Sequence, residues 1–222
     1  MTDVEFERKI DLACIFLFPA GLLIFFVLAR LGYATGEYGD TYIAATHIVI
    51  AMLVAIIPAI RYTRKLVFPY WFVIIITLNI YAYGIPLFLG FYDNFWWWDE
   101  FAHWMSTLFV SMVVFVALCL IQCFGGRTDM PTGILCFLTF IGGFAFGNVW
   151  ELMEGTIDWL VGGDYMQHHM ADSLEDIHMD FLGALTMGIV GFVLLKRKSP
   201  EDIVASMDEK HIIYNATHHH KK

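Results

Sequence analysis

The sequence has 222 residues, of which 59 % are hydrophobic and 16 % are charged, and its mean hydropathy is +0.64. These values exclude an ordinary soluble domain and indicate an all-α, polytopic membrane protein. The formal net charge of −9 argues against nucleic acid as a partner, because phosphates repel an acidic surface. The four cysteines lie in or beside apolar runs and form no CxxC motif, so we expect no disulfide framework.

Six apolar runs along the chain are each long enough to cross about 30 Å of hydrocarbon as a helix. The first run follows Arg8 and Lys9, as a signal peptide would, but no small-residue cleavage site precedes Arg30. We therefore interpret it as a retained anchor. The predicted spans are 11–31, 41–60, 67–90, 103–124, 131–153 and 177–196. Together they predict a single transmembrane helical domain over residues 1–198 and a polar cytoplasmic tail over residues 199–222.

The basic residues predict the orientation, because Lys and Arg accumulate in short loops on the cytoplasmic side. With six spans and a cytoplasmic N-terminus, the C-terminus is also cytoplasmic, and nearly all of the short-loop charges agree. The expected location is the inner (plasma) membrane of the cell as a multi-pass protein, with membrane lipids as partners. The basic residues on the cytoplasmic side are Arg8, Lys9, Arg61, Arg64, Lys65, Arg127, Lys196, Arg197 and Lys198.

More than half of the 22 acidic residues fall on the other, extracytoplasmic side. Acids hardly influence topology, so their grouping needs another cause. Most of them belong to three motifs: residues 98–104 lead into the fourth span, residues 150–159 leave the fifth, and residues 172–184 enter the sixth. Because all three motifs lie at the same membrane depth, a compact bundle is expected to bring them together.

Helical spacing places the acidic side chains of each motif on one face. Asp172, Asp176 and Asp180 are four residues apart and form one slanted stripe. Stacked carboxylates repel each other by roughly a few tenths of a kcal/mol per exposed pair, so a positive partner is expected. Di-iron and di-manganese helical bundles use two Glu-x-x-His pairs, and this chain has one. The predicted metal ligands are Glu100, His103, Glu151, Glu154, Asp176 and Asp180.

The predicted site has a definite chemistry. Carboxylates combined with imidazole favour one or two divalent ions of Zn, Fe or Mn over Ca or Mg. Asp172 and Asp158 are spare carboxylates, and either is a candidate general base toward a metal-bound water. Further candidate ligands are His47, His168, His169 and His178. His178 ranks below the others because it points away from the aspartate stripe, and His47 is equally compatible with a hydrogen-bonded packing histidine.

Small residues four positions apart predict where the spans pack closely. Gly143 and Gly147 lie in the fifth span, and Ala184 and Gly188 lie in the sixth. Such spacing allows two helix backbones to approach each other. The aromatic stretch 91–98, Phe-Tyr-Asp-Asn-Phe-Trp-Trp-Trp, is typical of a belt at the membrane–water interface.

At its polar motifs the chain resembles the bacterial YjdF-type inner-membrane family, a group of unknown function. The resemblance rests on Asp-x-x-x-His at 99–103, Trp-Glu-x-x-Glu at 150–154 and Asp-x-x-x-Asp-x-x-x-Asp-x-x-Gly-Ala at 172–184, and it covers about residues 90–190. The VanZ-like membrane family is distantly similar, with a shorter acid–histidine signature. The resemblance implies a compact helical membrane domain whose polar motifs belong together, and it implies no established activity.

Three classes of function stay open at this point. The leading hypothesis is a metal-binding membrane protein, with the site on the extracytoplasmic side, acting as a hydrolase or transferase on a lipid or envelope substrate. No G-x-S-x-G or HExxH motif supports an enzyme directly. An alternative is an accessory or scaffolding subunit of a larger membrane complex, because 20 Phe and 7 Trp offer large contact surfaces to other membrane subunits. A second alternative, an ion- or proton-coupled transporter, is disfavoured because the acids lie at one membrane edge.

Overall fold

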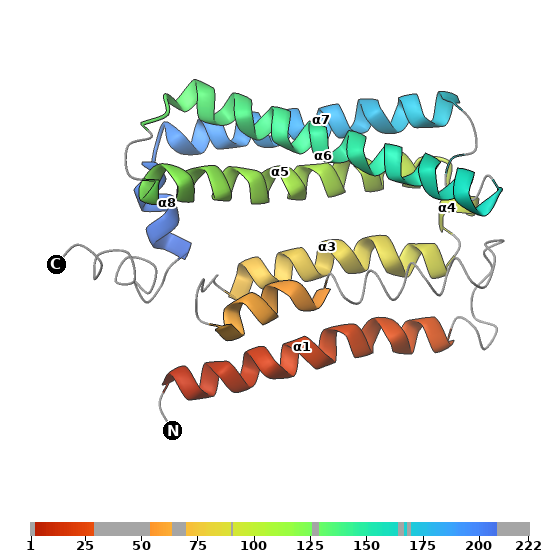
Figure 1. The fold of residues 1–222 in the computed structure, drawn as a ribbon, viewed down its shortest axis with the longest axis horizontal. Coiled ribbons are helices and arrows are strands. Elements are labelled where there is room, and N and C mark those ends of the chain that lie inside the picture. The colour runs from red at the N-terminus through yellow and green to blue at the C-terminus, as the bar shows by residue number, and fades with distance from the viewer. Residues whose placement is uncertain are drawn as a thin grey trace. The chain divides into compact units, whose positions relative to one another are not determined.

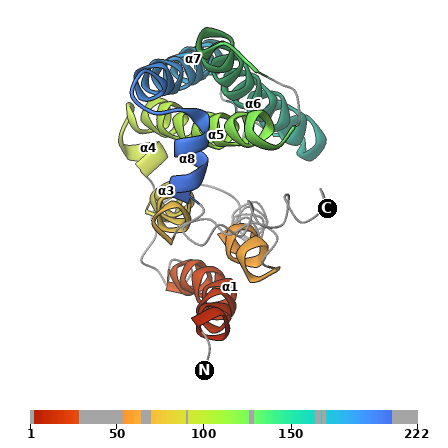
Figure 2. The same cartoon turned by 90° about the vertical axis from the view of Figure 1, so that its left-hand side faces the viewer.

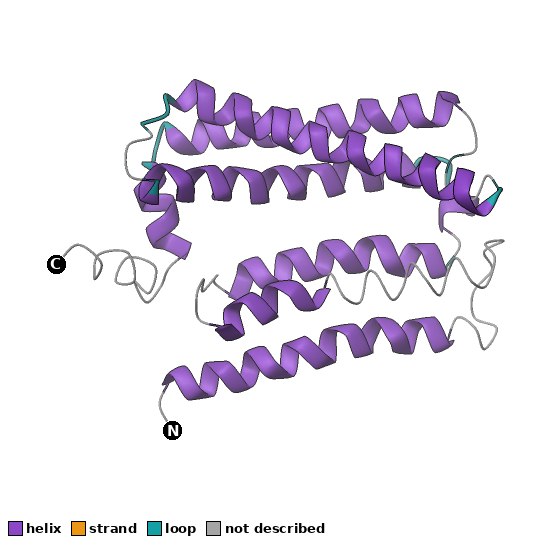
Figure 3. Ribbon diagram, viewed as in Figure 1, coloured by secondary structure: helices purple, strands orange, loops and turns teal. Residues whose placement is uncertain are grey.

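The computed structural model describes residues 3–28, 54–63, 70–89, 91–125, 129–163, 167 and 170–207. The regular elements in these ranges are all helices, with no strand among them, so the all-α class is confirmed (Figure 3). The chain divides into two compact units, Met1–Trp96 with Met207–Lys222 and Trp97–Ser206. The single domain over residues 1–198 and the polar tail after it stay predictions.

The first unit contains helices from the N-terminal part of the chain. The hydroxyl of Tyr81 donates a hydrogen bond of 2.5 Å to the carbonyl of Phe18, and Leu22 and Val54 form the centre of a small apolar core. These contacts join three helical segments that are far apart in sequence. The helices are α1 (Asp3–Leu28), a short helix over Val54–Thr63, α3 (Tyr70–Phe88) and α4 (Phe91–Asn94) (Figure 1).

A buried ion pair lies in this first unit. Asp11 of α1 is 1 % exposed and Arg61 is 2 % exposed, and Arg61 Nε lies 3.0 Å from Asp11 Oδ1. The Arg61 guanidinium also lies over the ring of Tyr70 at the start of α3, 3.9 Å from the ring centroid. Arg61 is one of the residues that predict the orientation, and the structure pairs it with Asp11 inside the unit.

The second unit is an antiparallel bundle of three long helices in which each contacts the other two. Seen close to the direction of the helix axes, the three form a triangle (Figure 2). All three are long and apolar enough to cross a membrane. A short helix follows them. These helices are α5 (Trp98–Phe124), α6 (Thr132–Val161), α7 (Met170–Leu195) and α8 (Pro200–Met207).

The predicted spans 103–124, 131–153 and 177–196 locate these helices, and each helix extends beyond its predicted span at the acidic end. α5 begins at Trp98, α6 continues to Val161, and α7 begins at Met170. The acidic motifs are therefore part of the helices themselves. The physical reason has two parts. The key carboxylates face the bundle interior, and an unbroken helix satisfies its own backbone N–H and C=O groups where its outer face is apolar.

The remaining predicted spans have a partial counterpart in the structure. The runs 11–31 and 67–90 correspond to α1 and α3, with the apolar part of α3 at Phe72–Pro86. Residues 41–53 lie outside the described part of the chain. The total of six spans and the sidedness of the termini stay predictions.

The ends of two helices in the second unit follow ordinary capping chemistry. Gly162 ends α6 with a φ of 79°, a left-handed conformation that favours glycine, and its N–H donates to the carbonyl of Asp158 at 2.8 Å. Ser199 and Asp202 form a reciprocal capping box at the start of α8, with hydrogen bonds of 3.0 and 3.1 Å. The hydrogen bonds from the backbone and side chain of Ser199 lower the pKa of Asp202 below its ordinary value.

The predicted small-residue seam is confirmed at two positions. A Cβ on Gly147 of α6 would collide with the Asp180 side chain of α7, and a Cβ on Gly188 of α7 would lie 3.4 Å from Phe140 Cβ of α6. Gly143 instead faces Ser111 of α5. The close approach at Gly147 allows a carboxylate to lie directly against a neighbouring helix backbone.

Gly183 of α7 lies directly against the backbone of α5, and its replacement by alanine is expected to destabilise the bundle. The added Cβ would meet the Trp104 carbonyl and lie 3.0 Å from Leu108 N, so one helix must shift. We expect Gly183→Ala to lower the free energy of unfolding by about 1–3 kcal/mol, measured by thermal unfolding in detergent. Gly133→Ala is the matched control, because nothing lies within 4 Å of its Cβ. An equally small change in both variants would contradict the close packing.

Candidate functional site

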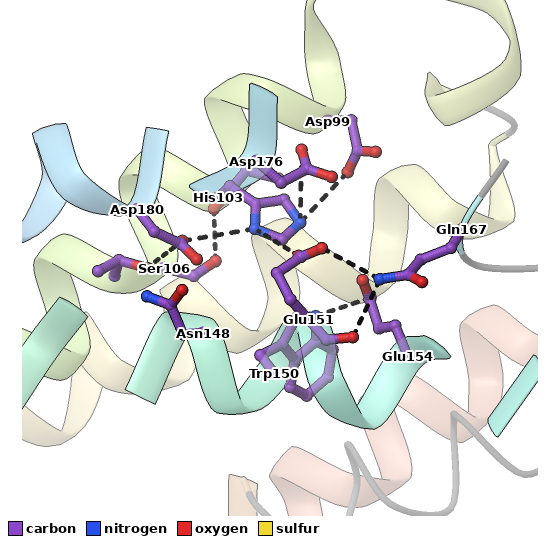
Figure 4. Close-up of polar contacts among 12 residues, drawn as sticks. Asp99, His103, Ser106, Asn148, Trp150, Glu151, Glu154, Gln167, Asp176 and Asp180 are labelled. Carbon is purple, nitrogen blue, oxygen red and sulfur yellow. Dashed lines mark hydrogen bonds and ion pairs between the residues drawn. The ribbon is translucent and has the colours of Figure 1, made fainter. Parts of the chain in front are cut away.

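His103 of α5 lies at the centre of a buried polar cluster formed by all three long helices (Figure 4). Its Nδ1 lies 3.4 Å from Asp180 Oδ1 of α7 and 3.6 Å from Glu151 Oε1 of α6. Its Nε2 lies 3.8 Å from both Asp99 Oδ1 of α5 and Asp176 Oδ1 of α7. Each ring nitrogen therefore faces a separate pair of carboxylates.

The cluster is shielded from its surroundings except at one edge. Asp180 is 1 % exposed, Glu151 4 %, Asp176 5 % and His103 8 %. The side chain of Asp99 is 36 % exposed and marks the open edge. Buried ionised groups are costly unless a counter-charge or hydrogen bonds compensate them. The arrangement therefore requires protons or a cation in addition to the histidine.

No lysine or arginine in the three long helices can provide that charge. The sequences of α5, α6 and α7 contain neither residue type, although together they hold nine acids. Lys196, just after α7, is 16 residues from Asp180, which corresponds to about 24 Å along a helix. Within these three helices, the imidazole of His103 is the basic group that lies within 4 Å of these carboxylates, and it faces four of them.

The separations around His103 are too long for direct charge-assisted hydrogen bonds, which span about 2.7–2.9 Å. They match a different geometry. Two ligand atoms that bind one tetrahedral metal at about 2.1 Å lie about 3.4 Å apart. In addition, Glu151 Oε1 and Asp180 Oδ2 are buried and have no hydrogen-bond partner among the described residues. Of these two, Glu151 Oε1 lies 3.6 Å from His103 Nδ1, whereas Asp180 Oδ2 lies against Gly147 of α6 and Asp180 Oδ1 faces the imidazole. A buried, unsatisfied carboxylate oxygen beside an imidazole nitrogen is a donor arrangement of a cation site.

Neutral donors hold the other oxygens of these two carboxylates. The Thr107 hydroxyl of α5 donates to Asp180 Oδ1 at 2.5 Å. The amide of Gln167 donates to the Glu151 carbonyl at 3.0 Å and lies 3.4 Å from Glu151 Oε2. Such outer contacts fix the orientation of carboxylates that ligate a metal.

A second group of acids continues along α6 beyond Glu151. Trp150 Nε1 donates to Glu154 Oε1 at 2.7 Å, and the backbone N–H of Gln167 donates to Asp158 Oδ2 at 2.8 Å. Both carboxylates are buried. Gln167 thus contacts Glu151 and Asp158, two residues that lie about two helical turns apart on the same face of α6.

The structure brings together four of the predicted ligands: His103, Glu151, Asp176 and Asp180. Glu154 is buried close by, where Trp150 holds it. Glu100 has a buried Oε2 with no hydrogen-bond partner among the described residues. Asp172 lies half-buried in the first turn of α7. The metal-ligand roles, and the catalytic roles of Asp172 and Asp158, stay predictions.

Three contacts in the site were missed by the sequence reasoning: those of Asp99, Thr107 and Gln167. Asp99 had a visible signal, because it lies four residues before His103 and therefore on the same helix face. Thr107 and Gln167 had none. His178 is exposed and bonds through Nδ1 to the Leu174 carbonyl at 2.6 Å, away from the cluster as expected. His47, His168 and His169 lie outside the described residues.

Replacing Thr107 with valine is expected to weaken the site without changing its shape. The substitution removes the hydroxyl that donates to Asp180 and leaves a buried carboxylate oxygen unsatisfied. We expect the free energy of unfolding to fall by about 1–3 kcal/mol in detergent. Thr139→Val is the control, because that buried hydroxyl donates only to the Leu135 carbonyl of its own helix. If the two variants lose the same stability, Thr107 has no special role in holding Asp180.

Apolar helices of spanning length around a buried polar cluster define a helical membrane protein. Comparison with known proteins specifies the family: residues 18–197 match the family described as predicted membrane protein (DUF2238), and the chain belongs to that family. The expected membrane family of unknown function is thereby confirmed, and the match extends beyond the expected region of residues 90–190.

One relative among curated proteins is similar to part of the chain. An uncharacterised protein of Thermotoga maritima is 27 % identical over 100 residues, which are 45 % of this chain and 50 % of that protein. The chain therefore spans about half the length of the curated relative that it matches. No solved structure matches the chain.

Proposed function

We propose that the cluster around His103 binds one or two divalent metal ions. The observation that carries this proposal is the buried Glu151 Oε1, which lies 3.6 Å from His103 Nδ1 and has no hydrogen-bond partner among the described residues. Asp180 Oδ1 lies 3.4 Å from the same nitrogen. The donor atoms form two groups: Asp99 with His103 and Asp176, and His103 with Glu151 and Asp180. Within each group, the donor atoms all lie within 4.8 Å of one another. Imidazole with carboxylates favours Zn, Fe or Mn over Ca or Mg.

Hydrolysis or group transfer is the chemistry that such a site supports best. An ion held by three protein ligands keeps a position for water or substrate and lowers the pKa of the bound water. Among the carboxylates beyond the ligands, Glu154 and Asp158 are buried and Asp172 is half-buried, and we assign the role of general base to Asp158 or Asp172. Trp150 and Gln167 hold Glu154 and Asp158 in place.

The surroundings of the site favour an amphiphilic substrate, such as a lipid or a lipid-linked envelope precursor. The helix faces that point away from the cluster at the same level carry exposed apolar side chains, including Leu152, Trp159 and Leu174. In a membrane protein such a surface contacts lipid. A molecule that reaches the open edge at Asp99 from this surface would carry an apolar part.

The proposed topology has six spans, cytoplasmic termini and the acidic site on the extracytoplasmic side. In a variant whose four native cysteines are replaced, we expect Trp159→Cys to react with a membrane-impermeant thiol reagent in intact cells. Ser199→Cys, beyond the other end of α7, should react only after the membrane is opened. The reverse pattern of labelling would place the site on the cytoplasmic side.

Metal-dependent stabilisation tests the proposed function. Detergent-purified protein stripped with a chelator should gain about 3–4 kcal/mol of stability when Zn²⁺, Mn²⁺ or Fe²⁺ is present at 100 to 1,000 times its dissociation constant. The same preparation should then be assayed for hydrolysis of lipid phosphoesters with and without the ion. Failure of all three ions to raise the unfolding temperature would refute the metal site, whereas stabilisation without hydrolysis would refute only this choice of substrate.

A further inference from the structure

The two nitrogens of His103 face unequal pairs of carboxylates, and this inequality assigns a role to each pair. On the Nδ1 side, Glu151 and Asp180 are both buried. On the Nε2 side, Asp176 is buried, but the Asp99 side chain is 36 % exposed. The nitrogen–oxygen separations are also shorter on the Nδ1 side, 3.4 and 3.6 Å against 3.8 Å for both contacts of Nε2.

The Nδ1 pair has the features of metal ligands. Each carboxylate keeps one oxygen without a hydrogen-bond partner among the described residues, Glu151 Oε1 and Asp180 Oδ2. Each has its other oxygen next to a neutral donor, the Gln167 amide or the Thr107 hydroxyl. A neutral donor orients a carboxylate without neutralising its charge, so Glu151 Oε1 and Asp180 Oδ1, the oxygens that face His103 Nδ1, stay available for a cation.

The Nε2 pair has the features of orienting groups. A neutral imidazole carries a single N–H, so an ion on Nδ1 places the proton on Nε2. Nε2 lies between Asp99 and Asp176, and a histidine that ligates a metal usually donates its other N–H to a carboxylate. That donation fixes the tautomer and the ring orientation.

We infer that a single divalent ion binds to His103 Nδ1, Glu151 and Asp180, while Asp99 and Asp176 hold the Nε2 proton. This inference rests on the proposed metal site and specifies its ligands. It makes Asp176 a positioning residue rather than a ligand, and it adds Asp99 in the same role. The three protein ligands leave a further position for water or substrate, as in catalytic metal sites.

Titration of the stripped protein with Co²⁺ tests the inference, because tetrahedral Co²⁺ absorbs visible light. The wild type should bind one equivalent. Glu151→Gln and Asp180→Asn should abolish the absorption band at the same Co²⁺ concentrations. Asp99→Asn and Asp176→Asn should still bind one equivalent with a band of the same shape, but with an affinity about 10–100-fold lower. Circular dichroism and gel filtration identify variants that fail to fold, and only folded variants are compared.

Three results would overturn the inference in different ways. A loss of the band in Asp176→Asn as complete as in Glu151→Gln would make Asp176 a ligand. Binding of two equivalents by the wild type, with only one lost in Asp99→Asn, would make the Nε2 side a second ion site. Neither result affects the proposed metal site itself. If the wild type binds no Co²⁺, Zn²⁺ or Mn²⁺, the proposed function fails together with the inference.

Discussion

Replacing His103 with leucine is expected to abolish metal binding and to lower the free energy of unfolding by about 3–5 kcal/mol. The imidazole is the one group among the described helices that lies between four carboxylates, at 3.4 to 3.8 Å from each. Its loss leaves buried acids that must take up protons or rearrange. The measurement is thermal unfolding in detergent together with metal content.

His178→Leu is the matched control for this variant. His178 lies on α7 beside the aspartate stripe, but it is exposed and its Nδ1 bonds the carbonyl of Leu174 in its own helix. Its replacement should change the free energy of unfolding by less than about 0.5 kcal/mol and leave metal content intact. Equal effects of the two substitutions would show that His103 does not organise the cluster.

Arg61→Met is expected to destabilise the first unit by about 3–5 kcal/mol, because it leaves the carboxylate of Asp11 buried without its partner. The ion pair at 3.0 Å joins two helical segments that are 50 residues apart. Loss of the guanidinium also removes its contact with the ring of Tyr70. The free energy of unfolding in detergent measures the effect.

The double variant Asp11→Leu/Arg61→Met separates the charge from the packing. With both charges removed, the stability should recover most of the loss, because no unpaired charge stays buried. A double variant as unstable as Arg61→Met alone would mean that the shape of the arginine, rather than the pairing of charges, stabilises this unit.

The sequence predicted that the three polar motifs lie close together. All three are at span ends on the same side of the membrane, and neighbouring helices of a bundle bring such ends into contact. His103, Glu151, Asp176 and Asp180 all came from spacings of three or four residues. The spacing could not choose between neighbours. Asp99 and Glu100 lie four and three residues before His103, and both spacings share its helix face, but in the structure it is Asp99 that lies 3.8 Å from His103 Nε2.

Other parts of the site depend on contacts between segments, and no local pattern reports these. Gln167 reaches Glu151 from the segment between α6 and α7, across 16 residues of sequence. Thr107 reaches Asp180 across 73 residues. The helices extend beyond the predicted spans for a related reason: hydropathy marks where apolar residues stop, and the helices continue because their acids face inward.

Elemental analysis by plasma mass spectrometry tests the metal site most directly. The sample is detergent-purified protein lacking the His218–His220 tract, so that these three histidines contribute no metal to the result. It is compared with the same protein carrying Glu151→Gln and Asp180→Asn. We expect about one Fe, Mn or Zn ion per chain, and none in the double variant. A wild-type protein without Fe, Mn, Zn, Ca or Mg would contradict the metal site and leave a cluster of carboxylates that share protons around His103.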